Sequence, residues 1–446
     1  MIWEMLTSLS PTHVMGLIDE GILDIIALLC YAAPIVALVI WGFCSAIGKR
    51  RITLYAVGGM ILALALTIVL LPEQYIDMSP AKLITPSEDA VARFSALESP
   101  IEVRIMANAS ERDSLLFAAL QTLARRTGKV RYAPPEYISS ATFHDVNSLR
   151  VYREEAFVVV PYRRLLLNNP AAQSGQPNLL LNLESELLQA AELLAHDVPR
   201  IYRVSGPVDE EYPTVLVGAM RVLTQEPIEA IELTQPVPME CDLLVIDDPR
   251  TDLDASQSAY LMAYLRRGGK LLLLTDYAYG AMPGLGAALF ETGLSAIDGV
   301  VLDPGGAMGG AVQYPMPTPS DGHVVGRWMS AGKRMPLLSL SHAIAMQGEG
   351  TSPILMSTKD AYLQLNDLEH ASLASGEEDL SGSFALAASS EMSGGKVVWI
   401  ASADMMSIIS DADVGGANEA LILACMRYLL DVQVEPILAK ILTVAP

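Results

Sequence analysis

The sequence predicts a membrane-anchored α/β protein: two N-terminal transmembrane helices followed by an extracytoplasmic, two-part α/β domain with mostly parallel sheets. Three observations lead to this prediction. Two long uncharged apolar runs lie near the N-terminus, a strand–helix–strand pattern occupies the middle of the chain, and further apolar runs alternate with amphipathic helical segments around it. The chain of 446 residues is long enough for two or three domains and a sizeable core.

The two apolar runs cover residues 25–47 and 52–71, and neither contains a charged residue. Each is long enough to cross a hydrocarbon core of ~30 Å with ~20 residues per helix. Residues 25–71 are therefore predicted to form two transmembrane helices joined by a short hairpin. A cleaved signal peptide is the alternative, but its basic residues would precede the apolar run, whereas here they follow it.

Basic residues between the two runs predict the orientation of the chain. They are the first Lys and Arg residues of the sequence: Lys49, Arg50 and Arg51. The positive-inside rule places this hairpin in the cytoplasm. Residues 1–24 and the long remainder of the chain are then expected on the outer side. The two helices serve either as an anchor alone or, through small residues such as Gly58 and Gly59, as a docking surface for another membrane helix.

Composition excludes some partners and cofactors. The formal net charge of −22 argues against nucleic acid as a partner, because phosphate binding depends on Lys and Arg. The four Cys contain no Cys-x-x-Cys pair and the six His are scattered, so no metal site and no cofactor are predicted.

The central pattern spans residues 241–277. Two short apolar runs each end in an aspartate, Asp247 and Asp276, as is typical of strands buried on both faces. Between them, Asp254 and Gln257 have the spacing of a capping box, and a pair of glycines ends the helix. A strand–helix–strand unit of this length predicts a right-handed parallel crossover.

The remaining elements are expected in two parts after a connector over residues 72–100. Apolar alternation and helical periodicity predict the first α/β part over residues 101–195 and the second over residues 196–446. Predicted elements of the first part are strands at 101–106, 130–133 and 150–160 and helices at 111–126 and 179–195. Those of the second part outside the central pattern are strands at 199–204, 228–233, 299–302, 335–342, 352–357, 383–388 and 396–401 and helices at 213–223, 285–292 and 418–430. A Gly/Pro-rich loop covers residues 305–320, and a loop of this length is usually functional or disordered.

Motifs for covalent chemistry are missing from the sequence. Gly268-Gly269-Lys270 is followed by Leu271 and enters a strand, so it lacks the hydroxyl residue and the spacing of a phosphate-binding P-loop. No Gly-x-Ser-x-Gly nucleophile elbow occurs. We therefore predict no catalytic residues, and any ATP hydrolysis is expected in another chain.

Aspartates at predicted strand ends are the candidate ligand-binding residues. They are Asp247, Asp276 and Asp404, with Asp248 and Tyr277 beside them. In open α/β sheets, ligands bind beyond the carboxyl ends of parallel strands. These carboxylates are placed to bind sugar hydroxyls or a cationic group, or else to cap helices and tighten turns, and both interpretations remain open.

The order of these elements resembles the GldG family, auxiliary subunits of ABC transport systems named after gliding-motility proteins. The resemblance rests on the aspartate-ended strand DLLVIDDP, the segment YLRRGGKLLLLTD, the later DGVVLDP, the closing GKVVWIASADMMS and the early IEVRIMANAS. It covers roughly residues 101–431. Family members often carry a Gly-His-Gly-Glu-like loop where this chain has Ser-Gly-Pro-Val-Asp-Glu at 205–210, so no role for that histidine is carried over. Some members also end in a transmembrane helix that is missing here.

The resemblance implies a non-enzymatic partner of an ABC-2-type permease and a separate ATPase. We therefore predict a membrane-anchored auxiliary subunit that binds substrate or serves as a scaffold. The alternatives are a cell-surface glycan-binding protein and a hydrolase that uses the strand-end aspartates.

Overall fold

The computed structural model describes residues 14–15, 17–18, 21–46, 58–59, 75–106, 113–133, 148–168, 179–204, 215–224, 228–276, 282–365, 375–392, 394–432 and 434–442. They form a mixed α/β protein with several sheets and an N-terminal apolar helix, as the sequence predicts. The basic hairpin and all of the second predicted span except Gly58 and Gly59 lie outside these residues. Both therefore stay predictions.

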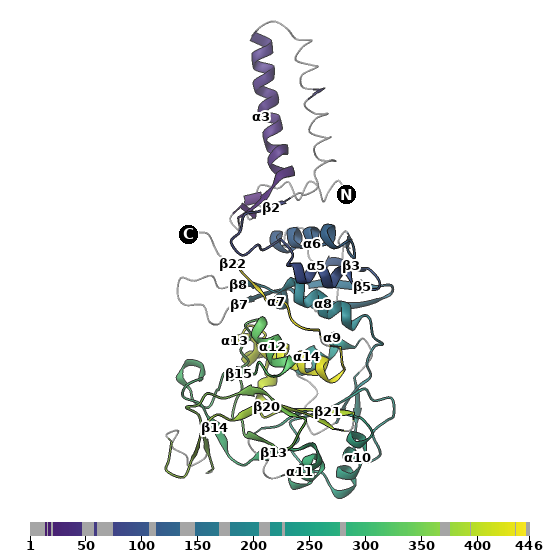
Figure 1. Ribbon diagram of the computed structural model, residues 1–446, viewed down its shortest axis with the longest axis vertical. Helices are drawn as coiled ribbons and strands as arrows, with labels where there is room; N and C mark the ends of the chain where they lie inside the picture. Colours follow the sequence, from purple (N-terminus) through teal and green to yellow (C-terminus); the bar gives the residue numbers. More distant parts are fainter. Residues whose placement is uncertain are drawn as a thin grey trace.

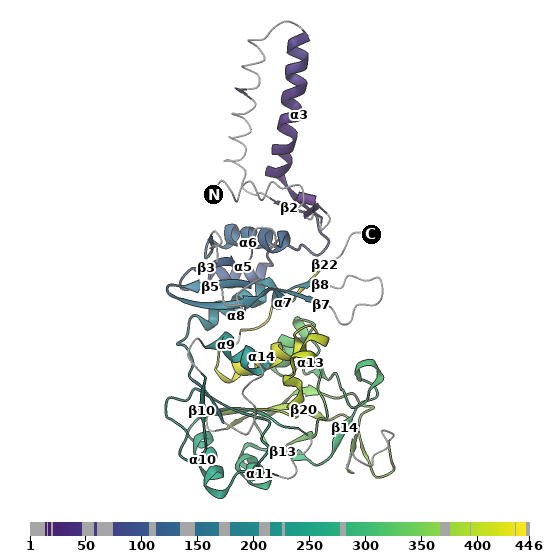
Figure 2. The ribbon, with the colours of Figure 1, turned by 180° about the vertical axis from the view of Figure 1, so that it is seen from behind.

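The apolar helix α3 (Ile25–Ala46) projects from one end of the α/β body (Figures 1 and 2). Its most apolar stretch, Ile25–Phe43, is long and apolar enough to cross a membrane and is only 6% buried. At its base, β1 (Ile22–Asp24) pairs antiparallel with β2 (Tyr75–Asp77). The Asp24 carboxylate accepts a hydrogen bond from the Ala27 amide at 3.0 Å, which satisfies one of the free amides of the first helical turn.

The part of the body next to α3 is built on a mixed sheet of strand order β4-β3-β5-β6. Its strands are β3 (Ile101–Met106), β4 (Val130–Ala133), β5 (Ser148–Arg153) and β6 (Ala156–Pro161), and its helices are α5 (Glu88–Ser95), α6 (Ser114–Thr127), α7 (Tyr162–Leu165) and α8 (Leu183–Leu193). The Asp113 carboxylate caps α6, whose buried face includes Leu116, Leu120 and Leu123. The predicted helix over 111–126 is thus confirmed from Ser114 onward.

The far part of the body is built on a larger sheet, in which the parallel strands β10-β9-β11-β12-β21 continue into the antiparallel strands β20-β16-β13. These strands are β9 (Ile201–Val204), β10 (Glu229–Ile231), β11 (Leu243–Asp247), β12 (Lys270–Leu274), β13 (Leu294–Ile297), β16 (Ala343–Met346), β20 (Ala385–Met392) and β21 (Gly395–Ile400), with β17 (Thr351–Met356) and β15 (Thr318–Pro319) attached. The helices are α9 (Val215–Leu223), α10 (Ala255–Arg266), α11 (Pro283–Leu289), η2 (Phe290–Thr292), η3 (Met308–Gly310), α12 (Val324–Ala331), η5 (Asp404–Met406), α13 (Ile408–Asp413) and α14 (Ala417–Leu429). Short strands β14 (Val300–Leu302), β18 (Tyr362–Gln364) and β19 (Leu380–Ser381) form a separate sheet.

Both faces of the parallel strands are buried, which is why their sequences are continuous apolar runs. Along β12, Leu272 and Leu274 belong to the core shared with α9, α12, α14 and the part next to α3. Leu271 and Leu273 point the other way and pack with residues of α10 and α11. The two views show α9 and α14 between the large sheet and the smaller part of the body, and α10 and α11 on the far side (Figures 1 and 2).

The predicted crossover at the centre of the chain is confirmed. Strands β11 and β12 pair in parallel, and α10 connects them. The capping box is present in both directions, between the Asp254 side chain and the Gln257 amide and between the Gln257 side chain and the Asp254 amide. Gly269 is required after the helix, because a β-carbon there would lie 2.5 Å from the Tyr264 carbonyl oxygen.

The prediction of mostly parallel sheets is wrong outside the central strands. Antiparallel pairings outnumber parallel ones among the described strands. The reason is that short turns join several strands that are neighbours in sequence, and such turns permit only antiparallel pairing. The predicted single strand at 150–160 is one example, since β5 and β6 form a hairpin around Glu154, whose φ of 58° suits a tight turn.

Two further elements differ from their predictions. The predicted helix over 179–195 begins only at Leu183, because residues 179–181 form β8 and pair with β7 (Leu166–Asn168). The predicted strand over 335–342 is wrong, because these residues form no strand, and the strand in this region is β16 at 343–346. The backbone there is bonded by a side chain instead of a neighbouring strand. Asn418 Oδ1 accepts a hydrogen bond from the Leu337 amide at 2.8 Å, and Asn418 Nδ2 donates one to the Leu337 carbonyl at 3.1 Å.

The Gly/Pro-rich loop over 305–320 is ordered by one buried carboxylate. Asp303 accepts hydrogen bonds from the Gly305 and Gly306 amides, both at 3.1 Å, and from the Thr358 amide at 2.8 Å. The loop therefore contains regular elements, η3 and β15, and is held against the turn after β17. The turn at Asp303-Pro304 therefore has a structural role, because the Asp303 carboxylate holds the loop in place.

The C-terminal segment returns to the part of the body next to α3. Its strand β22 (Lys440–Leu442) pairs antiparallel with β8, giving the order β22-β8-β7 (Figure 1). On the way, the Val434 carbonyl accepts a hydrogen bond from the Gln189 amide group at 2.9 Å. The segment thus connects the two parts of the body, which the sequence analysis does not anticipate.

Candidate functional site

Three parallel strands place their carboxyl ends at one edge of the large sheet. In the register of the sheet, Asp247 of β11 lies opposite Leu274 of β12, and Leu274 lies opposite Ile400 of β21. The residues that follow these strands therefore meet at this edge. They include Asp248, Asp276 and Asp404.

Asp248 and Asp276 share one guanidinium. Arg250 Nη2 lies 2.5 Å from Asp248 Oδ2, and Arg250 Nη1 lies 3.1 Å from Asp276 Oδ2. The Arg250 side chain is 53% exposed, whereas the two carboxylates are mostly buried. The chain reverses sharply here, because Asp248 has a φ of 47°, in the left-handed region that Asn and Asp tolerate better than most residues. At this edge of the sheet, two largely buried carboxylates are thus bridged by one solvent-exposed arginine.

Asp404 completes this acidic cluster, which we define as Asp248, Arg250, Asp276 and Asp404. Burial raises the pKa of Asp248 above its usual range although Arg250 bonds to it, and the charges of Asp276 and Asp404 raise it further. Ser339 Oγ donates a hydrogen bond to Asp404 Oδ2 at 3.4 Å. The cluster therefore has an excess of negative charge, which suits a cationic group or the hydroxyls of a polyol.

Asp247 does not join the acidic cluster. Its carboxylate is 2% exposed and accepts two hydrogen bonds of 2.7 Å from Arg203 of the neighbouring strand β9. Such a two-point pair is a strong structural contact in a buried setting. Tyr277, also predicted beside the site, lies outside the described residues.

Replacing Asp247 with Asn is expected to destabilise the protein strongly. The change removes a buried carboxylate that Arg203 binds at two points, and loss of one member of a buried pair costs about 3 kcal/mol or more. The free energy of unfolding in urea measures this loss. Asp248→Asn is the matched control, because Asn also tolerates positive φ and the arginine that Asp248 pairs with, Arg250, is 53% exposed and stays solvated, so a much smaller change, below about 1 kcal/mol, is expected. Equal stability of the two variants would contradict this role for Asp247.

A buried polar chain lies behind the acidic cluster. Trp399 Nε1 donates to Thr275 Oγ1 at 2.7 Å, and Thr275 Oγ1 lies 2.8 Å from His342 Nε2. His342 Nδ1 lies 3.0 Å from the Ala343 carbonyl oxygen, so the neutral ring donates from Nδ1 and accepts at Nε2. Burial lowers the pKa of His342 to about 4. These hydrogen bonds fix the position of Thr275, the residue that precedes Asp276.

Acidification is expected to destabilise the protein through His342 and His323. Burial also lowers the pKa of His323 to about 4, and Arg327 adds to the effect. Between the ordinary pKa of 6.5 and about 4, the unfolded chain binds protons that the native state excludes. Stability therefore falls as the pH drops through this window, by up to about 3 kcal/mol for each group.

Urea unfolding of wild type and a His342→Gln variant from pH 7 to pH 4 measures this dependence. Gln keeps a hydrogen-bonding side chain but does not titrate, so the variant should lose less stability on acidification than wild type. Substitution of the exposed His196 should leave the slope unchanged. Parallel curves for wild type and His342→Gln would show that His342 does not titrate as proposed.

The two cysteine thiols described in the α/β body, Cys241 and Cys425, are held in their protonated form. Burial raises the pKa of Cys241 to about 11, and burial also raises the pKa of Cys425. Both are therefore poor nucleophiles. Within the described residues, no group of three or more His, Cys, Asp and Glu side chains is arranged to hold a metal ion.

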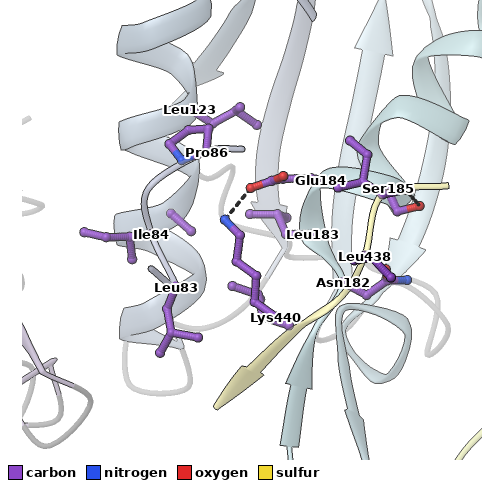
Figure 3. A pocket seen from close by; sticks show the side chains of 13 residues that line it. Leu83, Ile84, Pro86, Leu123, Asn182, Leu183, Glu184, Ser185, Leu438 and Lys440 are labelled. Carbon is purple, nitrogen blue, oxygen red and sulfur yellow. Dashed lines mark hydrogen bonds and ion pairs between the residues drawn. The ribbon is translucent and has the colours of Figure 1, made fainter. Parts of the chain in front are cut away.

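A shallow pocket lies away from the acidic cluster, where the connector, α6, α8 and the C-terminal segment meet (Figure 3). Its lining is mainly apolar, and its charged groups are already paired. Lys440 contacts Glu184, and Ser87 Oγ donates to the same carboxylate at 2.6 Å. No polar group of the described lining points into the pocket without a partner. We therefore interpret the pocket as a packing defect at this junction and place the candidate ligand site at the strand ends.

Sequence reasoning found the carboxylates of the site but missed their partners. Arg203, Ser339 and His342 lie on other strands or loops, and no spacing signal connects them to the aspartates. The Asp-Asp-Pro-Arg segment at 247–250 was the available local signal, since it places an arginine two residues after Asp248.

No protein-family model and no curated protein matches the sequence. Solved structures that align with part of this chain include the mmIFT52 N-terminal domain, which is 12% identical with a TM-score of 0.40 over 52% of this chain and 96% of that chain. A putative ThuA-like protein from Parabacteroides merdae is 10% identical with a TM-score of 0.34 over 55% of this chain and 97% of that chain. The carbohydrate deacetylase Agd3 is 11% identical with a TM-score of 0.31 over 50% of this chain and 32% of that chain. Similarity at this level carries no functional argument.

Proposed function

We propose that this chain is a non-enzymatic, membrane-anchored auxiliary subunit of an ABC-2-type transport system, and that it binds a substrate or supports the permease. Two spans anchor it in the cell membrane, with the hairpin at residues 49–51 in the cytoplasm and the α/β body on the outer side. The resemblance of its element order to the GldG family supports the partners, an ABC-2-type permease and a separate ATPase.

One observation carries the proposal: α3 extends away from the body with its apolar side chains uncovered. Leu38, Trp41 and Phe43 are more than 60% exposed, and no charged residue interrupts the helix. Apolar surface of this extent is unfavourable in water and favourable in lipid. A lipid anchor accounts for it without any change in the body.

The acidic cluster is the proposed ligand site on the outer side. Arg250 holds Asp248 and Asp276 in fixed positions, so little side-chain order has to be gained when a ligand binds. Amines or polyol hydroxyls match the excess of carboxylate oxygens. A binding role needs no nucleophile.

Co-purification tests the proposal. After mild solubilisation of membranes, a tagged full-length chain should recover a multi-span permease and a P-loop ATPase, identified by mass spectrometry. A matched sample carrying Asp248→Asn should recover the same partners, because a ligand-site change should leave the anchor and the assembly intact. Repeated recovery of the full-length chain without either partner would count against the transport role.

The second candidate is a cell-surface glycan-binding protein or hydrolase. The observation in its favour is that burial raises the pKa of Asp248 beside a second carboxylate, a combination that a glycoside hydrolase needs for acid catalysis. Glycan binding and release of reducing sugar should be measured on wild type and on an Asp248→Asn, Asp276→Asn double variant. Turnover that disappears in the double variant would favour the hydrolase, and binding without turnover would favour a glycan-binding protein.

A further inference from the structure

A buried cluster of charged side chains lies where the two parts of the body pack together. We define the arginine cluster as Arg164 of α7, Glu186 of α8, Arg334 after α12 and Arg427 of α14. All four are buried, and Arg427 is only 1% exposed. Helices α7 and α8 belong to the part next to α3, whereas α12 and α14 cover the large sheet (Figures 1 and 2). The cluster is therefore assembled only when the two parts are in contact.

Glu186 is already used by two of the arginines. Arg164 Nη2 lies 2.9 Å from Glu186 Oε2 as an ion pair without good hydrogen-bond alignment. Arg334 Nη2 donates to Glu186 Oε1 at 3.1 Å and to the Arg164 carbonyl oxygen at 3.1 Å. Asn182 also donates to Glu186 Oε1, at 3.3 Å. Both oxygens of this carboxylate are therefore in use, and few of its acceptor positions remain for a further cation.

Arg427 has no acceptor of its own in the described part of the chain. None of its guanidinium nitrogens has a hydrogen-bond partner there, and the Nε and Nη1 atoms of Arg164 and Arg334 also lack one. Burial, together with the charges of Arg164 and Arg334, lowers the pKa of Arg427 to about 9, so the group stays protonated at neutral pH. The side chain thus brings a positive charge and several unused donors into the interior.

Nearby carboxylates do not balance this charge. Glu419 pairs with Arg163 at 2.7 Å, and the Asp411 carboxylate accepts a hydrogen bond from the Glu419 amide at 3.0 Å. Burial raises the pKa of Asp411, and the Asp411 charge acts on Arg334. Among the described groups at this junction, positive charges exceed negative ones. A buried, uncompensated guanidinium costs several kcal/mol, and water satisfies its donors without neutralising its charge.

We propose that the arginine cluster binds a small inorganic anion of the halide class, held by Arg427 together with the free donors of Arg164 and Arg334. A compact monovalent anion supplies the missing charge and accepts several N–H groups at once. Because the site draws residues from both parts of the body, the bound anion stabilises their packing, and the local anion concentration sets how firmly they are held together.

Thermal unfolding of the full-length protein in detergent tests this proposal. Buried Trp328 and Trp399 report unfolding by their fluorescence. Sodium chloride is titrated against sodium gluconate at constant ionic strength. The proposal predicts that the unfolding temperature rises with chloride, with the logarithm of its concentration once this exceeds the dissociation constant, and that it rises similarly with bromide. Identical unfolding temperatures in chloride and gluconate would overturn it.

Variants show whether the effect belongs to the cluster. Arg427→Met keeps much of the side-chain length but removes the unpaired charge, so the chloride dependence should disappear. Arg163→Met is the matched control, because Arg163 precedes Arg164 in α7 but is 61% exposed and paired with Glu419. It should retain the full dependence. Equal chloride dependence in wild type and Arg427→Met would also overturn the proposal.

A second measurement does not depend on the variants folding. The line width of ³⁵Cl in nuclear magnetic resonance should broaden with wild-type protein and sharpen when bromide competes. Broadening that bromide does not reverse, or no broadening above that of a detergent blank, would show that no such site exists.

Discussion

Glu186→Gln is expected to destabilise the protein by at least about 3–5 kcal/mol, the range for removal of one partner from a buried ion pair. The side chain is fully buried and is in contact with Arg164 and Arg334. The substitution removes the carboxylate that these two arginines share, in an interior that already contains the unpaired charge of Arg427. Because native proteins are stable by only about 5–15 kcal/mol, much of the variant should be unfolded at physiological temperature.

Urea unfolding of purified protein measures this effect. The matched control is Glu192→Gln on the same helix, which lies near the surface and should change the stability by less than about 0.5 kcal/mol. The double variant Glu186→Gln, Arg334→Met should lose less than the sum of the two single changes, since it removes a cation together with the anion. A loss below about 1 kcal/mol for Glu186→Gln would contradict the assigned role of the cluster.

Removal of residues 1–74 is expected to transfer the protein from the membrane fraction to the soluble fraction. Helix α3 contacts β1 but is almost entirely unburied by the body. The truncation also removes β1 and two residues of the larger core, Leu17 and Ile22, and leaves the rest of both hydrophobic cores in place. The full chain should stay in the membrane pellet after an alkaline carbonate wash, and the truncated chain should not. The circular dichroism spectrum of the truncated chain should remain that of a folded α/β protein.

A chain lacking only residues 1–20 is the control for this truncation. It keeps α3 and β1, so it should remain in the pellet after the same wash. If the chain lacking residues 1–74 were folded and still pelleted, the membrane association would come from the body rather than from the apolar helix.

The elements predicted best from the sequence are those whose signal is local. The capping box at Asp254 and Gln257 and the apolar runs of β11 and β12 each appear where expected. The elements predicted least well depend on contacts between distant segments. Strand β22 forms because β8 offers it an edge, and residues 337–339 are held by side chains of Asn418 and Ser402 instead of a strand. No local pattern encodes such pairings.

The candidate site follows the same division. Parallel strand topology is sufficient to predict that Asp248, Asp276 and Asp404 meet at one edge. It does not separate them from Asp247, whose carboxylate is turned inward and paired with Arg203. That distinction depends on the strand beside β11, which the order of the chain alone does not specify. The arginine cluster was not predicted for a similar reason, since Arg164, Arg334 and Arg427 come from segments far apart in sequence.

The central claim is that the α/β body lies on the outer side of a membrane that α3 enters. Proteinase K added to intact cells or spheroplasts tests it directly, with antibodies against tags after residue 375, next to β19, and at residues 49–51. The account predicts loss of the tag in the body without lysis and protection of the hairpin tag until detergent is added. Protection of the body in intact cells and its digestion only after lysis would invert the orientation and contradict the proposed function.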